Sequence, residues 1–147
     1  LSLRRQRQMC IRDSITPISG GMSGRKSRRE IKDMTLQRFV DMGLSDGETI
    51  WNSYPSSLSG GMNQRVGIAL AMLLHPSLLL ADEPTGNLDP GNSMEIMKLL
   101  EEINNRGTTV LVVTHNREIV NSMKKRVITM RKGVVVSDEK EGEYHEV

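Results

Sequence analysis

Two adjacent carboxylates and one imidazole follow short apolar runs of the sequence. Asp82 and Glu83 come after the run at 78–81, and His115 comes after the run at 109–114. A short apolar run that ends in a polar residue is typical of a fully buried strand in a parallel sheet. Ligands bind such sheets at the C-terminal ends of the strands, so we expect chemistry at these residues. A carboxylate at a strand end, such as Asp82, can hold Mg²⁺, usually through water.

A serine and two glycines open a predicted helix upstream of the first run. Ser59, Gly60 and Gly61 precede an apolar-rich stretch that ends before Pro76. The free backbone amides and the positive dipole end of a helix start suit an anion. An ordinary N-cap explains the same three residues, and on their own it is the preferred interpretation.

Four motifs occur in a fixed order along the chain. They are LSGGMNQR (58–65), LLLADEP (78–84), GNLD (86–89) and TH (114–115). Each motif alone is weak, since a carboxylate that ends an apolar strand occurs in many folds. Together, over about residues 54–147, they resemble the ATPase subunits of the ATP-binding cassette (ABC) family, with its signature, Walker B segment and catalytic Glu, D-loop and switch His. The resemblance implies an enzyme that binds and hydrolyses ATP, with ATP and Mg²⁺ as its ligands.

The resemblance also implies a role for each matching residue. Glu83 would be the general base that polarises the water attacking the γ-phosphate, and His115 would contact that phosphate. Asp89 would be the D-loop residue that couples two sites. The signature would contact ATP held by the opposite subunit of a head-to-tail homodimer of nucleotide-binding domains. Its ATP-binding residues would be Leu58, Ser59, Gly60, Gly61 and Gln64.

A glycine-rich segment near the start almost fits a phosphate-binding loop. The segment GGMSGRKS (20–27) departs from G-x-x-x-x-G-K-[ST] because Arg25 stands at the second glycine position. A Cβ there would collide with the phosphate, and Pro17 makes the preceding residues a poor central strand. We interpret the segment as a solvated basic turn before a helix. In this family the Walker A lysine lies upstream of all four motifs, so we expect the chain to bind ATP poorly by itself.

Helices and strands alternate over the rest of the chain. Apolar spacing and capping residues predict helices at 28–42, 60–75, 90–106 and 116–125, and strands at 78–82, 109–114, 127–130 and 134–136, with a loop at 44–55. This order predicts an α/β domain with a mostly parallel sheet. The resemblance implies a P-loop NTPase of the ABC type without its Walker A strand and loop. We assign residues 15–57 to part of the helical subdomain and residues 58–147 to the C-terminal half of the ATPase core.

Composition excludes several classes of protein. The chain has 147 residues, the length of one domain, and a net charge of +2 at pH 7, which argues against binding of nucleic acid by the whole chain. Cys10 is the only cysteine, so an intramolecular disulfide and a thiolate metal cluster are excluded and a reducing compartment is expected. No segment reaches the ~18–20 apolar residues of a membrane span, so membrane association would need a partner protein.

The first fourteen residues are rich in arginine and show no clear periodicity. The string RQMCIRDS (7–14) resembles a translated sequencing adapter. We interpret residues 1–14 as an adapter-derived or disordered segment. A transit peptide and a nucleic-acid-binding arm are the alternatives that composition leaves open.

Two resemblances within the ABC family compete. Residues 15–90 look most like oligopeptide or nickel importer ATPases, whereas residues 85–147 look more like the FtsE-type cell-division ATPases of Gram-positive bacteria. The change falls within LLLADEPTGNLD (78–89), which motivates the further hypothesis that two genes are joined there. We favour the FtsE type. It implies an integral membrane partner of the FtsX type, or otherwise an importer permease, and a peripheral position on the cytoplasmic face of a bacterial membrane.

Two interpretations without catalysis stay open. The first is a regulatory ABC-like domain that lacks Walker A. The second, from a different class, is a DNA-binding module that uses the basic residues of 1–32, and it predicts salt-dependent affinity for DNA.

Overall fold

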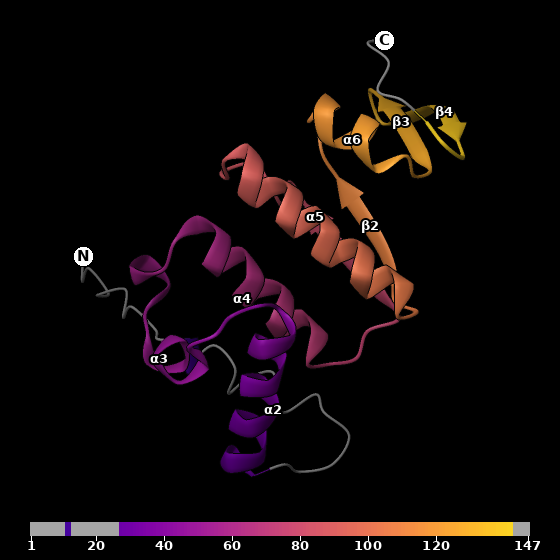
Figure 1. Cartoon of the computed structure of the whole chain (residues 1–147). Coiled ribbons are helices and arrows are strands. Elements are labelled where there is room, and N and C mark those ends of the chain that lie inside the picture. Colours follow the sequence, from indigo (N-terminus) through magenta and orange to yellow (C-terminus); the bar gives the residue numbers. More distant parts are fainter. Residues whose placement is uncertain (1–10, 13–26, 143–147) are drawn as a thin grey trace, which may run out of the picture.

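The computed structural model describes residues 11–12 and 27–142. Helices α2, α3 and α4 gather on one side of the long helix α5, and strand β2 lies along the other side of it (Figure 1). Helix α6 and the β3–β4 hairpin follow beyond β2 (Figure 1). Residues 1–10 and 13–14 of the segment interpreted as adapter-derived or disordered lie outside the described residues. Ile11 is described and buried, and its backbone N–H donates to the carbonyl of Ser53.

Helix α2 spans Arg28–Asp41, as the sequence predicts. Ser27 caps its start, because its hydroxyl accepts from the backbone of Glu30 while the Glu30 carboxylate accepts from the backbone of Ser27. The buried residues on the helix are Ile31, Thr35 and Phe39. The buried Thr35 hydroxyl donates a hydrogen bond to the Ile31 carbonyl at 2.8 Å. Because this bond replaces a bond to water, a polar residue fits in this core.

A short helix, α3 at Gly47–Asn52, occupies part of the predicted loop at 44–55, and the loop prediction is wrong there. Asp46 caps the helix by accepting from the backbone N–H of Thr49, and Ile50 anchors it in the core. Ile50 is the one buried residue among the six of α3, so the helix has no apolar periodicity by which the sequence could predict it. A 3-10 turn at Pro55–Ser57 then leads into the next helix.

Helix α4 spans Gly60–Met72, and Ser59 is its N-cap. It buries Val66, Ile68 and Ala69 against α2 and α5. The predicted helix from 60 to before Pro76 is confirmed, with its last turn ending at Leu73.

Strands β1 (Leu78–Asp82) and β2 (Thr109–Val113) form a parallel pair joined through α5 (Pro90–Asn105). The register sets Leu80 opposite Leu111 and Asp82 opposite Val113. Helix α5 buries an apolar stripe against the sheet and α4. The stripe consists of Ile96, Met97, Leu99, Leu100 and Ile103.

The prediction that both strands are fully buried is wrong. Burial alternates along β1, where Leu79 is buried and Leu80 is 66% exposed. On β2, Leu111 is 49% exposed. The reason is that α5 covers one face of the β1–β2 sheet, and the other face has no cover among the described residues.

Helix α6 (Arg117–Met123) and an antiparallel hairpin complete the described chain. Asn116 caps α6, within the predicted helix at 116–125. Strands β3 (Val127–Arg131) and β4 (Val134–Glu139) turn at Lys132 and Gly133, which both have positive φ, as a tight hairpin turn requires. The two predicted hairpin strands are therefore confirmed, although they form a sheet separate from β1–β2.

Candidate functional site

Asp82, Glu83 and His115 lie together because β1 and β2 are parallel and in register. Asp82 ends β1, and its register partner Val113 ends β2. The backbone N–H of Glu83 donates to the carbonyl of Val113 at 2.8 Å, which carries the pairing one residue past the strand. The sequence places His115 two residues after Val113, so both strand ends deliver their polar residues to one edge.

Glu83 has a left-handed backbone, with φ of 45°. This conformation is uncommon for a residue with a side chain and costs roughly 1–3 kcal/mol, so the surrounding contacts must hold it. On one side Glu83 donates to Val113, and on the other its carbonyl accepts from the N–H of Gly86 at 3.1 Å. Strain of this kind collects at functional sites, which favours a role for Glu83 beyond packing.

The carboxylate of Glu83 makes three hydrogen bonds to the two residues that follow β2. Its Oε1 lies 2.6 Å from Nδ1 of His115 and accepts from the His115 backbone N–H at 3.0 Å. Its Oε2 accepts from the hydroxyl of Thr114 at 3.3 Å. An ionised carboxylate has no proton to give, so Nδ1 of His115 is the donor. The side chain of His115 is 84% exposed, and its Nε2 is thus open to a ligand.

These contacts lower the pKa of Glu83. The largest cause is the hydrogen bond from the His115 side chain, and the charge of His115, its backbone N–H and the Thr114 hydroxyl add to it. Partial burial acts in the opposite direction and raises the pKa of Glu83. Glu83 is therefore held as a carboxylate, the form that can accept a proton from water.

Asp82 is exposed at the end of β1, directly before Glu83. Its oxygens are hard ligands of the kind that Mg²⁺ prefers, and the ion commonly takes only one or two carboxylates and completes its shell with water and phosphate. Among residues 11–12 and 27–142 no group of three or more His, Cys, Asp or Glu forms a metal cage. An exposed carboxylate such as that of Asp82 fits Mg²⁺ and does not fit a structural zinc site, which needs four protein ligands.

The predicted signature residues surround the start of α4. The Ser59 hydroxyl accepts from the backbone N–H of Met62 at 3.3 Å. Ser59 is therefore the N-cap of α4, as the simpler interpretation of the sequence predicts. Leu58 is half-buried and packs against the core, and its carbonyl accepts from the Asn63 side chain. Gln64 is half-buried one turn into the helix.

The two signature glycines lie against the GNLD loop and the start of α5. A Cβ at Gly60 would come within 3.1 Å of the Leu88 side chain, and a Cβ at Gly61 would come within 3.1 Å of Oδ1 of Asn92. Such distances are tighter than ordinary contact, so glycine permits the start of α4 to approach the loop this closely. Sequence reasoning placed these two motifs in one family pattern but did not predict that they touch within one chain.

Asp89 is the N-cap of α5, as its position before Pro90 predicts. Its carboxylate accepts from the backbone N–H of Asn92 at 3.0 Å and from the Asn92 side chain. The side-chain hydrogen bond from Asn92 is the largest cause that lowers the pKa of Asp89. Asn92 thus joins Asp89 to Gly61, a link that the sequence analysis missed because nothing in its pattern marks Asn92.

The predicted site residues form two groups. One group contains Asp82, Glu83 and His115 at the strand ends, with Thr114 as a member that the sequence analysis left without a role. The other contains the signature residues and Asp89. No hydrogen bond in the described part of the chain joins a signature residue to Glu83 or His115.

One sequence-based interpretation falls largely outside the described residues. The segment GGMSGRKS (20–27) lies outside the described residues except for Ser27, the N-cap of α2. As for membranes, no helix among the described residues is both long and apolar enough to span one.

Comparison with known proteins gives one family. Residues 2–86, more than half of the chain, match the family model described as ABC transporter. The cell division ATP-binding protein FtsE of Bacillus subtilis is 62% identical over 91 residues, which are 62% of this chain and 40% of that protein. FtsE of Streptococcus pneumoniae serotype 2 is 50% identical over 119 residues, which are 81% of this chain and 50% of that protein. The chain thus spans half the length of these relatives or less.

Solved structures give the same fold. The dimeric ATP-binding cassette MJ0796, in a post-hydrolysis state bound to ADP and Pi, superposes with a TM-score of 0.76 at 33% identity. The match covers 92% of this chain and 58% of that cassette. The described helices and strands therefore have the arrangement of part of a nucleotide-binding domain.

Proposed function

The chain belongs to the ABC transporter family of ATPases, and on this premise we propose that it is the part of an FtsE-like subunit that carries the hydrolytic residues and the signature. The whole subunit would bind and hydrolyse ATP in a membrane complex that acts in cell division. The observation that carries the proposal is the Glu83–His115 contact of 2.6 Å at the C-terminal edge of β1 and β2.

In this proposal Glu83 is the general base. Its lowered pKa keeps it ionised, and its left-handed backbone fixes the carboxylate at the sheet edge. It accepts a proton from the water that attacks the γ-phosphate of ATP. His115 donates to Glu83 through Nδ1 and presents Nε2 to the γ-phosphate. Asp82 would hold Mg²⁺ through water, and the bound ion supplies positive charge against the phosphates.

The signature residues would act on a nucleotide held by another subunit. Ser59 and the backbone amides at the start of α4 suit a phosphate, because a helix start offers N–H donors and the positive end of the helix dipole. The dimeric state of the cassette MJ0796 also supports a second nucleotide-binding domain as partner. Asp89, fixed by Asn92, would couple the signature to the site of the opposite subunit.

The FtsE-like assignment is supported by identities of 62% and 50% to two cell-division proteins. An integral membrane protein of the FtsX type would be the second partner, and the subunit would then lie on the cytoplasmic face of the membrane. Since no segment of the 147 residues fits the phosphate-binding loop, we propose that ATP binding needs residues that this chain does not supply.

A graft tests the catalytic roles. Residues 54–147 would replace the matching segment of FtsE of Bacillus subtilis, whose own sequence supplies the rest of the site. We expect the graft to hydrolyse ATP, and Glu83→Gln in the graft to lower kcat by about 10²–10⁴-fold, because the general base is lost. Glu118→Gln, an exposed acid on α6, is the matched control and keeps the activity.

Each outcome of the graft has a meaning. A graft that folds and binds ATP but does not hydrolyse it contradicts the proposed function. A graft that keeps full activity with Glu83→Gln contradicts the role of Glu83 while leaving the family role of the subunit intact.

A further inference from the structure

Arg65 joins three helices. It lies on α4, six residues after the signature Ser59, and its side chain is 19% exposed. Its Nη1 donates to the carbonyl of Met42 at 2.7 Å, and its Nη2 donates to Oε2 of Glu95 at 2.7 Å. The two partners are 23 and 30 residues away in sequence, so the contacts exist only in the folded chain.

The first partner is the end of α2. Met42 is the C-cap of that helix, where unpaired carbonyls and the negative dipole end favour a cation. Gly43 follows with φ of 74°, and a Cβ there would come within 3.2 Å of Nη1 of Arg65. The chain therefore turns away from α2 at a glycine, and the turn leaves the guanidinium room at the helix end.

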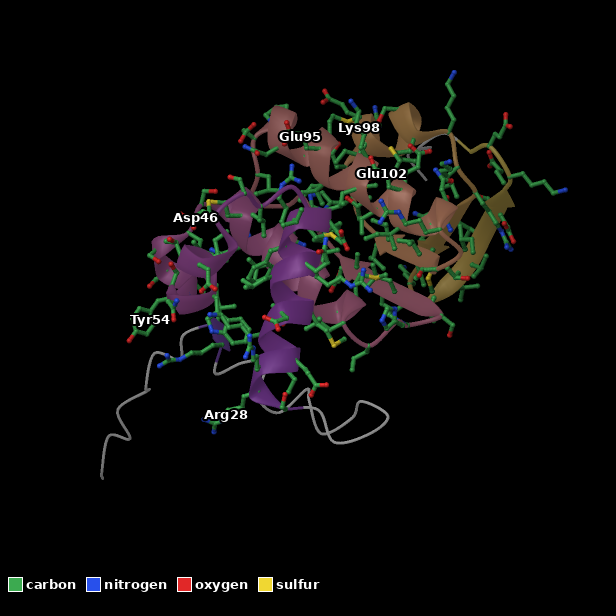
Figure 2. All side chains as sticks on the ribbon, turned by 60° about the horizontal axis from the view of Figure 1, so that its bottom comes forward. Arg28, Asp46, Tyr54, Glu95, Lys98 and Glu102 are labelled. Carbon is green, nitrogen blue, oxygen red and sulfur yellow. The ribbon has the colours of Figure 1, made fainter. Side chains whose placement is uncertain are left out.

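The second partner lies on α5, the helix that starts at Asp89. Glu95 is 62% exposed, so Arg65 is the less exposed member of the ion pair. Figure 2 shows Glu95, Lys98 and Glu102 following one another along α5. A cleft of about 360 Å³ separates this side of α5 from the end of α2, and Arg65 is part of its lining. Across this cleft, Arg65 connects the two helices.

We propose that Arg65 is a positioning residue that fixes the signature against the GNLD loop. The inference rests on the proposed function, because it assigns a purpose to the position of the signature. The start of α4 meets α5 through Gly61 and Asn92, and Arg65 ties the middle of the same helix to Glu95. Two attachment points along α4 set its direction, and the bond to Met42 sets α2 against both helices.

The chemistry of the side chain is specific. The planar guanidinium of Arg65 offers two N–H groups in a fixed fork, one for the Met42 carbonyl and one for the Glu95 carboxylate. A lysine offers a single ammonium on a flexible chain, and it cannot hold both partners in one geometry. The loss of Arg65 also leaves the carbonyl at the end of α2 without this partner.

Distance measurements between spin labels on the full chain test the inference without ATP. Cysteines would replace the exposed residues Asp33 on α2, Ser56 before the signature and Asn105 at the end of α5, two at a time in a Cys10→Ser background. With Arg65 present, each label pair should give one narrow distance maximum.

Two substitutions should act differently on the three label pairs. Arg65→Ala should remove the narrow maximum from all pairs, and Arg65→Lys should restore part of it. Glu95→Ala removes the acceptor on α5 and breaks only that link, so the pairs that include Asn105 should broaden while the Asp33–Ser56 pair stays narrow. Lys98→Gln, in the lining of the same cleft, is the matched control and should change none of them.

The results separate this inference from the proposed function. Narrow maxima that persist in a folded Arg65→Ala chain would overturn the positioning role, as would equal broadening by Lys98→Gln. If Arg65→Ala loses its helical circular dichroism, Glu95→Ala is the deciding variant. Unchanged distance distributions for the pairs that include Asn105 would then overturn the inference. The distance measurements could support the role of Arg65 while the graft fails to hydrolyse ATP. Arg65 would then remain a positioning residue, and the proposed ATPase function would be rejected.

Discussion

Nδ1 of His115 and Oε1 of Glu83 lie 2.6 Å apart, although the two residues are 32 positions apart in sequence. The parallel register of β1 and β2 brings them together, and the backbone N–H of His115 adds a second bond to the same oxygen. The pairing of the two strands therefore brings Glu83 and His115 into contact.

This pair makes folding stability depend on pH. The pKa of Glu83 in the folded chain is lowered below its ordinary 4.5, so the pair stabilises the fold fully above about pH 4.5. The contribution is lost as the pH falls through the lowered value, because the folded state must then protonate the carboxylate. We expect the difference in unfolding free energy between the wild type and His115→Ala to shrink over this range. Urea unfolding from pH 7 to pH 3 measures it, and parallel curves for the two proteins would contradict it.

Two glycines on α4 should respond oppositely to alanine. A Cβ at Gly67 meets nothing within 4 Å, so Gly67→Ala should stabilise the chain by about 0.5–1 kcal/mol through the lower entropy of the unfolded state. Gly61→Ala should destabilise it instead, because Asn92 cannot retreat without leaving Asp89. Urea unfolding of both variants checks the signs.

A double-mutant cycle gives the control for the glycine prediction. Asn92→Ala removes the obstructing side chain, so it should lessen the cost of Gly61→Ala when both are present. Additive effects of the two substitutions would mean that the contact between Gly61 and Asn92 does not set the cost.

Neighbouring residues on α2 should differ strongly in their effect on stability. Phe39 is fully buried among α2, α3 and α4, and Phe39→Ala should cost about 3–5 kcal/mol through lost burial and a cavity. Val40 is 62% exposed, and Val40→Ala should change the unfolding free energy by less than about 0.5 kcal/mol. Equal effects of the two would show that α2 does not pack as described.

Sequence patterns predicted the helix starts well, because a cap is a local device. Ser59, Asp89 and Asn116 each accept a hydrogen bond from the backbone N–H three residues later, which depends on residue type and spacing alone. Helix α3 was missed since Ile50 is its only buried residue, and an isolated apolar residue has no period.

The parts of the site that depend on packing between distant segments are harder to predict from the sequence. The positions of Asp82, Glu83 and His115 at strand ends followed from the apolar runs, and their proximity followed once the strands were parallel. The roles of Thr114 and Asn92, and the bridge from Arg65 to Met42, depend on tertiary contacts that no single segment encodes. The full burial predicted for β1 and β2 failed for the same reason, because burial depends on what covers the second face of the sheet.

The exposed face of the β1–β2 sheet, opposite α5, should control the self-association of the chain. Leu80 and Leu111 are register partners, both exposed, with Leu78 and Val113 exposed beside them on the same strands. Contiguous apolar surface and unpaired strand edges promote association between copies, so we expect the chain expressed alone to form oligomers or aggregates as its concentration rises.

Paired substitutions separate the exposed face from the core in this test. Leu80→Thr with Leu111→Thr keeps strand propensity and should raise the monomer fraction measured by light scattering after size-exclusion chromatography. Leu79→Thr on the buried face should lower the unfolding temperature instead, because a hydroxyl enters the contact with α5. A wild-type chain that stays monomeric as its concentration rises would contradict the prediction, because the exposed apolar face would then not drive association.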